Sequence, residues 1–175
     1  MNSRLRKLAV LGSSLVAVTV AVGVVSVVPA ASATTTQMQG QTQMQAQTPV
    51  LTGIRTGRHV DFDRVVLDLD GSRPEFFVRS VDRLHYDGSG NPVPLPGAYF
   101  LEVRLAPAAA HDDNGNPTYT GPQQFDTPAL TNVQAVAITG DFEANLTVGL
   151  GMRRDSWHRV FLLDSPTRVV IDIGR

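Results

Sequence analysis

Apolar and polar residues alternate along much of the chain, and the clearest case lies near its C-terminal end. From residue 168 onward, one face of an extended segment is apolar and carries Val169, Ile171 and Ile173. This period of two is typical of a strand that buries one of its faces. Residues 159–163, Arg followed by four apolar residues, form another predicted strand. Pro166 between the two predicts a turn because proline has no N–H for a sheet. The sequence therefore predicts a closing β-hairpin.

The strand at residues 168–173 has a second copy earlier in the chain. Residues 64–69 read Arg-Val-Val-Leu-Asp-Leu, and residues 168–173 read Arg-Val-Val-Ile-Asp-Ile. In each copy the Arg and the Asp lie on the outward face, about 13 Å apart along the strand, which is too far for them to pair with each other. We therefore expect an internal structural duplication in which these charges form ion pairs across neighbouring strands.

Other segments show the same alternation, or short apolar runs, between turn-forming residues. With the closing hairpin included, the predicted strands cover residues 51–58, 64–70, 75–83, 98–106, 133–139, 146–152, 159–163 and 168–173. No stretch after residue 33 has the period of about 3.6 that a helix requires, so we expect at most a short helix or turn over residues 128–132. About eight short strands separated by turns predict an all-β fold, a β-sandwich or barrel.

The first 49 residues differ in composition and predict targeting and linker segments. Arg4, Arg6 and Lys7 precede an uncharged apolar run over residues 8–28 and an Ala-x-Ala pattern that ends at Ala33. We interpret residues 1–33 as a cleaved signal peptide; the alternative is an uncleaved signal anchor, since about 20 apolar residues suffice to span a bilayer. Residues 34–49 are rich in glutamine and uncharged, which predicts a disordered linker before a domain over residues 50–175.

Composition and charge exclude several classes of function. The chain has no cysteine, which excludes disulfides, thiolate metal sites and a lipid-modified cysteine. Of 15 basic residues, three lie in the leader, and the other 12 face 16 acidic residues, a net charge of −4. These arginines are scattered, whereas a nucleic-acid-binding protein needs a concentrated basic surface. We therefore expect no nucleic-acid partner.

The two repeated hexapeptides and the closing hairpin, whose residues 163–173 read Leu-Asp-Ser-Pro-Thr-Arg-Val-Val-Ile-Asp-Ile, carry a resemblance to a known family. Over residues 50–175 the chain resembles the AMIN and AMIN-like domains of bacterial envelope proteins, above all the AMIN-like proteins of high-GC Gram-positive bacteria. The resemblance implies a β-sandwich of two related sheets and a module that localises envelope proteins by binding the cell wall. Two departures are a longer insertion over residues 106–130 and the lack of a following amidase domain, so wall hydrolysis is not implied.

One segment between predicted strands is a candidate ligand site. It contains the only Trp of the chain among three arginines: Arg153, Arg154, Trp157 and Arg159. An exposed Trp can stack on a sugar ring, and Arg binds carboxylates such as those of peptidoglycan stem peptides. The alternative is that Trp157 packs over the hairpin with the arginine stems lying along it.

Two loops share the pattern Asp-x-x-Gly-Asn-Pro, at residues 87–92 and 112–117. Their Asp and Asn side-chain oxygens are potential calcium ligands, but neither loop has the order of ligands found in an EF-hand. A predicted strand of nine residues, about 30 Å long, separates them. We therefore expect tight turns at opposite ends of the domain, without a shared metal site.

The remaining residues give no catalytic signature. The four histidines, His59, His85, His111 and His158, are dispersed, and no serine lies in a Gly-x-Ser-x-Gly motif. A hydrolase or lyase with an acid pair would use Asp61, Asp63 and His59 first, although a charged loop explains this segment more simply. We expect no catalytic residues, no metal and no cofactor.

Together these observations predict a secreted, extracytoplasmic β-sandwich that is associated with the cell wall and is not an enzyme. The expected partner is a cell-wall polymer, peptidoglycan or an associated glycan, bound for localisation. The alternatives are a module that binds an envelope protein through a sheet edge and, less favoured, a cell-wall hydrolase. Membrane contact is expected only through an uncleaved signal anchor, and the sequence sets no oligomeric state.

Overall fold

The structure, a computed structural model, describes residues 47–175. The predicted signal peptide and all but the last three residues of the predicted linker lie outside the described residues. The described part contains the strands β1 (Val50–Arg58), β2 (Phe62–Asp70), β3 (Glu75–Val81), β4 (Tyr99–Ala106), β5 (Gln124–Asp126), β6 (Val133–Phe142), β7 (Asn145–Met152), β8 (His158–Leu163) and β9 (Thr167–Gly174). Within residues 47–175 there is no helix, and hence none that could cross a membrane.

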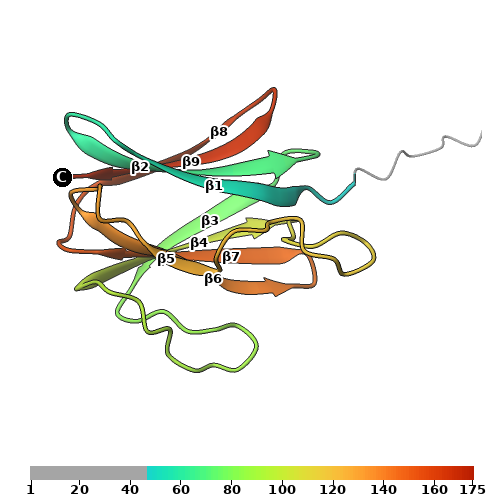
Figure 1. The fold of residues 1–175 in the computed structure, drawn as a ribbon, viewed down its shortest axis with the longest axis horizontal. Helices are drawn as coiled ribbons and strands as arrows, with labels where there is room; N and C mark the ends of the chain where they lie inside the picture. The colour runs from blue at the N-terminus through green and yellow to red at the C-terminus, as the bar shows by residue number, and fades with distance from the viewer. Residues whose placement is uncertain (1–46) are drawn as a thin grey trace, which may run out of the picture. The chain divides into compact units, whose positions relative to one another are not determined.

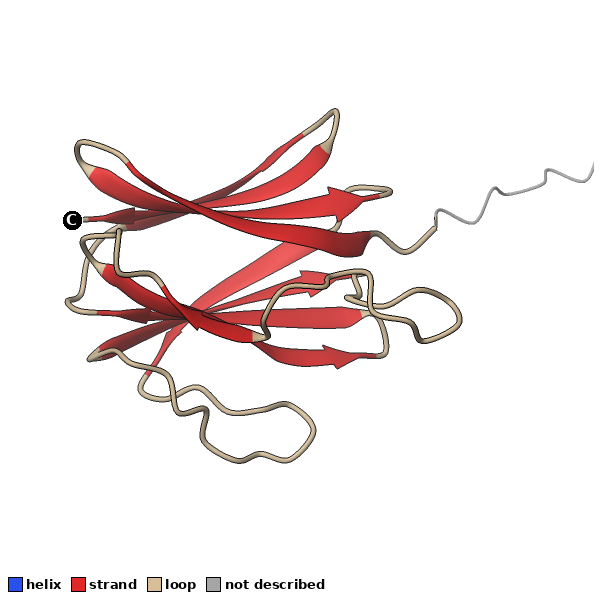
Figure 2. Ribbon diagram, viewed as in Figure 1, coloured by secondary structure: helices blue, strands red, loops and turns tan. Residues whose placement is uncertain are grey.

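The strands form two antiparallel sheets that lie face to face (Figure 1). Sheet A has four strands in the order β1-β2-β9-β8, and sheet B has five in the order β3-β4-β7-β6-β5. Figure 2 shows that strands and loops account for the whole domain. The connection between β2 and β3, residues 71–74, passes from one layer to the other. The predicted all-β sandwich is confirmed.

The core lies between the sheets and consists of alternate residues of their strands. Its fully buried members include Val65, Leu67, Leu101, Val103, Leu105, Leu146, Val148, Leu150, Val169, Ile171 and Ile173. The period of two seen in the sequence therefore identifies the inward faces of β2, β4, β7 and β9 correctly. Tyr99, which continues the same alternation, is 47% exposed because it is the first residue of β4, at the end of the sheet.

The two repeated segments lie side by side within sheet A. Strands β2 and β9 pair antiparallel, with Arg64 opposite Asp172 and Asp68 opposite Arg168. Because the two copies run in opposite directions, the Arg of each copy stands opposite the Asp of the other on the outward face. The repeat therefore generates a two-fold arrangement of charges inside one sheet.

The segment before β6 differs from the predicted pattern of eight strands. The structure has a ninth strand, β5, which is only three residues long and so is too short to show a period in the sequence. Residues 128–132, where a short helix or turn was expected, form a turn. The N–H of Leu130 donates to the carbonyl of Thr127, which closes this turn.

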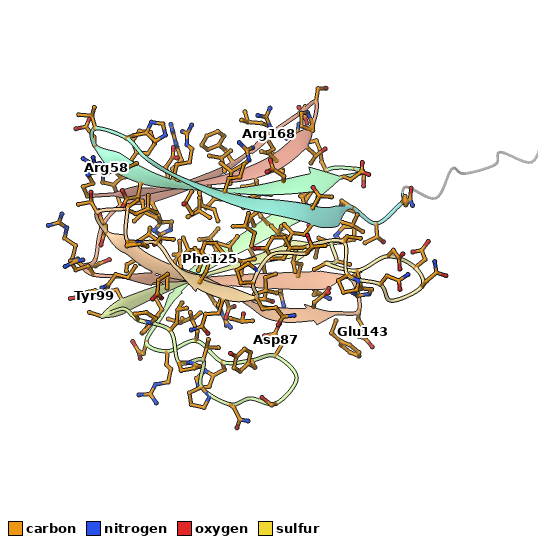
Figure 3. The ribbon with its side chains drawn as sticks, viewed as in Figure 1. Arg58, Asp87, Tyr99, Phe125, Glu143 and Arg168 are labelled. Carbon is orange, nitrogen blue, oxygen red and sulfur yellow. The ribbon has the colours of Figure 1, made fainter. Side chains whose placement is uncertain are left out.

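The two Asp-x-x-Gly-Asn-Pro loops approach the same end of β6, so the prediction of opposite ends is wrong. The N–H of Asp87 donates to the carbonyl of Thr139 at 3.0 Å, and His111 lies 2.8 Å from the carboxylate of Asp141. The prediction fails because the chain doubles back beneath sheet B after β3, which brings Asp87 under that sheet (Figure 3).

The loop that joins β3 to β4, residues 82–98, covers the outer face of sheet B. The buried contact consists of Leu84, Val93 and Leu95 from the loop and Ala135 and Ala137 from β6. Two glycines of β7 leave the necessary space: a Cβ at Gly149 would lie 2.5 Å from Leu84, and one at Gly151 would lie 2.0 Å from the carbonyl oxygen of Pro96. Within the described residues, no segment covers the outer face of sheet A in this way (Figure 1).

A buried carboxylate links the two sheets at one end. Asp63, on the inner side of β2, is fully buried and accepts hydrogen bonds from the backbone N–H groups of residues 131–133. Asn132 in turn donates to the carbonyl of Gly174 at 2.8 Å and accepts from the N–H of Arg154 at 3.0 Å. This network fixes the start of the β7–β8 loop, which carries three of the predicted ligand residues, Arg153, Arg154 and Trp157.

The contrast between a covered and an open face predicts the outcome of two glycine substitutions. Gly151→Ala should lower the free energy of unfolding by about 1–3 kcal/mol, because the new Cβ meets a backbone carbonyl. The matched control is Gly57→Ala in sheet A, where the nearest atom to a new Cβ is His59 Nε2 at 3.9 Å. Its effect should stay within about 0.5 kcal/mol. Urea denaturation measures both, and equal effects would contradict the difference between the faces.

Candidate functional site

The outer face of sheet A carries arginine and aromatic side chains around one buried carboxylate. We call this surface the arginine–aromatic face and define it by His59, Phe62, Arg64, Trp157, Arg159, Phe161 and Asp172. These residues come from the β1–β2 turn, from β2, β8 and β9, and from the loop before β8. The strand register places Arg64, Asp172 and Arg159 in one row across β2, β9 and β8.

Asp172 is the centre of this row. Its side chain is 0% exposed, and Arg64 binds it with two hydrogen bonds, Nε to Oδ1 at 2.6 Å and a terminal nitrogen to Oδ2 at 2.9 Å. Arg159 adds a third bond from its own terminal nitrogen to Oδ2 at 2.8 Å. The prediction of cross-strand ion pairs is confirmed for Arg64 and Asp172. It is wrong for Arg168, which makes no ion pair within the described residues, because Asp68 pairs with Arg55 of β1 instead.

The two guanidinium groups keep Asp172 ionised. Burial alone would raise the pKa of Asp172, but the hydrogen bonds from Arg64 and Arg159 outweigh it and hold this pKa below its usual value. The bond to Asp172 likewise raises the pKa of Arg64. With two cations and one anion, the row carries a net charge of +1 (2 − 1) in a chain whose net charge is −1.

Aromatic rings hold the guanidinium groups in place. The guanidinium of Arg64 lies 5.1 Å from the ring centre of Phe62 and 5.7 Å from that of Phe161, and Arg159 lies 4.8 Å from Phe161. These distances are in the range of cation–π attraction. The imidazole of His59 stacks on Phe62 at 4.4 Å. The face is therefore a preformed surface of alternating rings and cations.

Trp157 extends this surface and remains 54% exposed. Its indole packs over Gly174, where an added Cβ would lie 2.5 Å from the indole nitrogen. The N–H of Gly174 also donates to the carbonyl of Trp157 at 2.9 Å, and the ring centres of Trp157 and Phe62 are 6.3 Å apart. Trp157 thus packs against the closing hairpin with one part of its surface and presents the rest to solvent.

Of the four candidate residues from the sequence, the structure brings Trp157 and Arg159 together and leaves two apart. Arg153 and Arg154 are exposed, and their backbone N–H groups donate to Asn132. Arg153 lines a depression formed mostly with residues of the β5–β6 connection, which is separate from the arginine–aromatic face. Proximity in sequence places these two arginines near Trp157, but the chain turns between them and β8.

The residues missed by sequence reasoning are His59, Phe62, Arg64 and Phe161 as parts of one surface. Arg64 had a usable signal: aligning the two hexapeptides antiparallel places it opposite Asp172. Alternation along a strand places Phe62 on the same face as Arg64, and Phe161 on the same face as Arg159, but only the register between β2, β9 and β8 brings these two pairs together. Arg168 also lies on the outward side of sheet A (Figure 3), but its Nε donates to the carbonyl of Pro166 at 3.2 Å.

The three residues proposed for an acid pair do not converge. Asp63 faces the interior and binds backbone N–H groups, whereas His59 stacks on the outward-facing Phe62. Asp61 is exposed, and its carbonyl accepts a bond from the N–H of Arg175 at 3.2 Å. The described residues therefore do not assemble this trio into a reactive centre.

The Asp-x-x-Gly-Asn-Pro loops form tight turns, each closed by an isolated bridge, His85 with Pro92 and His111 with Pro117. In the second loop, hydrogen bonds from the side chain and the backbone of Asn116 hold the pKa of Asp112 below its usual value. Across residues 47–175, no three His, Asp or Glu side chains gather into a group that could hold a metal ion.

Comparison with known proteins gave one match. The model of the AMIN-like domain family matches residues 49–175, which is more than two thirds of the chain. A search of curated proteins and a search of solved structures returned no match.

The burial of Asp172 predicts a clear effect of its removal. Asp172→Asn should lower the free energy of unfolding at pH 7 by about 1–3 kcal/mol, because two guanidinium groups lose a buried anionic acceptor. Asp68→Asn is the matched control: Asp68 is also bound by an arginine, Arg55, but the side chain of Arg55 is 61% exposed. The control should cost less than about 1 kcal/mol in urea denaturation.

The free energies of unfolding of wild type and Asp172→Asn should also depend differently on pH. Because the pKa of Asp172 is lower in the folded state, its contribution is complete above the unfolded pKa of about 4 and is lost as the pH falls toward the folded pKa. The stability difference between wild type and Asp172→Asn should therefore shrink as the pH falls below about 4. A difference that stays constant across this range would show that the charge of Asp172 contributes nothing.

Proposed function

Because the chain belongs to the AMIN-like domain family, we propose that it is a non-catalytic module of the cell envelope that binds acidic cell-wall polymer through the arginine–aromatic face. AMIN-like domains occur in secreted cell-envelope proteins and are generally non-catalytic binding modules. This supports a location outside the cytoplasmic membrane, in agreement with the signal peptide predicted from residues 1–33. The proposed role is to keep the protein at the wall.

One observation carries the choice of site: an exposed Trp lies beside two arginines that share a single buried carboxylate, on a sheet face that no other described segment covers. The loop over sheet B shows that this fold can bury an outer face with a few apolar side chains and small strand residues. Sheet A instead presents rings and cations to solvent. An exposed group of this composition favours ligand binding over a structural role.

The chemistry of the face matches a polymer that combines sugar rings with carboxylates. A half-exposed indole can stack on the apolar face of a sugar. Within the described residues Arg159 uses one terminal nitrogen for Asp172, which leaves its Nε and its other terminal nitrogen for a ligand. Arginine binds carboxylates through pairs of parallel N–H groups. Peptidoglycan and acidic wall glycans present both kinds of group along a repeating chain.

The separation of Asp61, Asp63 and His59 supports binding over hydrolysis. A glycoside hydrolase needs two carboxyl groups that flank one bond, and a metal-dependent amidase needs several ligands around one ion. On the arginine–aromatic face the sole carboxylate is Asp172, which is buried and held by two guanidinium groups. Wall material incubated with the protein should therefore release no soluble fragments.

Replacing Trp157 tests the stacking contact. Trp157→Ala should weaken retention on purified peptidoglycan roughly tenfold, or about 1.4 kcal/mol, in a pull-down titration. Phe142→Ala is the matched control, because Phe142 is 70% exposed at the β6–β7 turn and belongs to another part of the surface. Equal retention by wild type and Trp157→Ala would exclude this site, and co-purification of an envelope protein instead of wall polymer would favour the sheet-edge alternative.

Replacing Arg159 tests carboxylate recognition. Arg159→Gln should reduce retention several-fold and leave the bidentate contact between Arg64 and Asp172 in place. Arg83→Gln, which removes an exposed positive charge from the loop over sheet B, should have no effect. Wall material whose carboxyl groups have been converted to neutral amides should bind wild type and Arg159→Gln equally. A persistent difference on that neutral material would contradict a carboxylate partner for Arg159.

A further inference from the structure

Strand β3 forms a free edge of sheet B. It pairs with β4 on one side, and no described segment pairs with its other side. The strand is seven residues long, so a row of backbone N–H and carbonyl groups is available along that edge. Such an edge readily pairs with another strand unless charges, proline or a covering segment prevent it. Pro74 lies just before the strand and leaves its interior open.

The side chains of β3 have a symmetric arrangement of charge. Glu75, Phe77 and Arg79 alternate along the outer face, with one negative and one positive residue at equal distances from the central Phe77. Phe77 is 51% exposed. Within residues 47–175 Glu75 makes no ion pair, whereas the Nε of Arg79 donates to Glu102 at 2.7 Å.

We propose that β3 pairs antiparallel with β3 of a second copy of this chain, around a two-fold axis through Phe77. Two copies of sheet B would then form one continuous sheet. On its outer face, Phe77 would lie opposite Phe77 of the partner subunit, and Glu75 opposite Arg79 of the partner subunit. The same two-fold axis repeats the ion pair on the other side of the aromatic pair.

The side chains select this register. When a two-fold axis passes through one residue of β3, each residue lies opposite the residue of the partner strand that is equally far from the axis on its other side. The two paired side chains lie on the same face of the sheet. An axis at Val78 would place Phe77 opposite Arg79 and leave Glu75 opposite Val81, and an axis at Phe76 would place Glu75 opposite Phe77. Only an axis at Phe77 pairs both charges with opposite charges, at the spacing of about 4.5–5.5 Å typical of cross-strand neighbours.

The geometry of Arg79 suits a second carboxylate. Its bond to Glu102 uses Nε and holds the side chain over β4, next to the edge. Arginine has five N–H groups, so its terminal nitrogens remain available for the partner's Glu75. The exposed ring of Phe77 lies 5.3 Å from the guanidinium of Arg104, in the range of cation–π attraction.

The other outer strands lack this complementarity. Strand β8 carries His158 and Arg159 without an acidic residue, and β1 carries Arg55 and Arg58 without one, so neither strand can form ion pairs with a second copy of itself. The edge of β1 is also partly occupied, since the N–H of Leu51 donates to the carbonyl of Ala109. Strand β5 has only three residues. The charge pattern therefore assigns the contact to β3.

The dimer would present two arginine–aromatic faces in one assembly. On a polymer with repeating units, a second contact raises retention through effective concentration without any new kind of interaction. This consequence rests on the proposed function, whereas the dimer itself does not. An edge-to-edge contact buries little surface, so the expected association is weak and depends on concentration.

Charge reversal tests the register. In sedimentation velocity of the chain without its predicted signal peptide, the wild-type mass should rise with concentration toward about twice the monomer value. Glu75→Arg and Arg79→Glu should each stay monomeric, because each places like charges opposite one another. An equal mixture of the two variants should recover the dimer, since the reversed charges then complement each other. Arg83→Glu, which makes a similar change in the loop over sheet B, should dimerise like wild type.

Single cysteine substitutions test the same register without reversing a charge, in case a reversed charge disturbs the fold. The chain has no cysteine of its own. Phe77→Cys should form a disulfide-linked dimer under mild oxidation, because residues opposite each other on a two-fold axis lie about 4.5–5.5 Å apart at Cα. Glu75→Cys should not, because its two copies would be offset by about 13 Å along the strands. Equal crosslinking of the two variants, or a wild-type mass that stays monomeric at every concentration, would overturn the proposal.

Discussion

The antiparallel pairing of β2 with β9 is the constraint on which the candidate site depends. It places Arg64 opposite Asp172 and joins both to Arg159 of β8, so that one buried carboxylate orients two cations on an outer sheet face. A shift of one residue would turn the apolar residues outward and move Asp172 into the core. The same hydrophobic alternation that forms the sandwich therefore also fixes the geometry of the charged row.

The two outer faces of the sandwich differ in how they are covered, for a physical reason. Small residues in β6 and β7, among them Gly149 and Gly151, let the β3–β4 loop pack closely on sheet B and bury Leu84. Sheet A has larger outward side chains, and its Gly174 makes room for an indole that stays half-exposed. Membership in the AMIN-like family supports a binding role in the envelope, and we propose the uncovered face as the surface for that role.

Period-two alternation was sufficient to predict most of the fold, because burial of one face leaves a direct trace in strands such as β7, where Leu146 and Leu150 point inward. It could not reveal β5, which is only three residues long, or the path of residues 82–98, which depends on contacts with β6. For the site, Trp157 was predictable as a rare residue among charged ones in a single segment. Phe62 and Phe161 were not, because only the register across three strands brings them together.

We propose above all that a cell-wall polymer binds the arginine–aromatic face. NMR chemical-shift mapping during titration with soluble peptidoglycan fragments tests it most directly, because every residue of the domain reports at once. The largest shifts should affect the indole N–H of Trp157 and the backbone of β2, β8 and β9, with little change in the loop over sheet B. Shifts confined to that loop, or to the Asp-x-x-Gly-Asn-Pro turns, would contradict it.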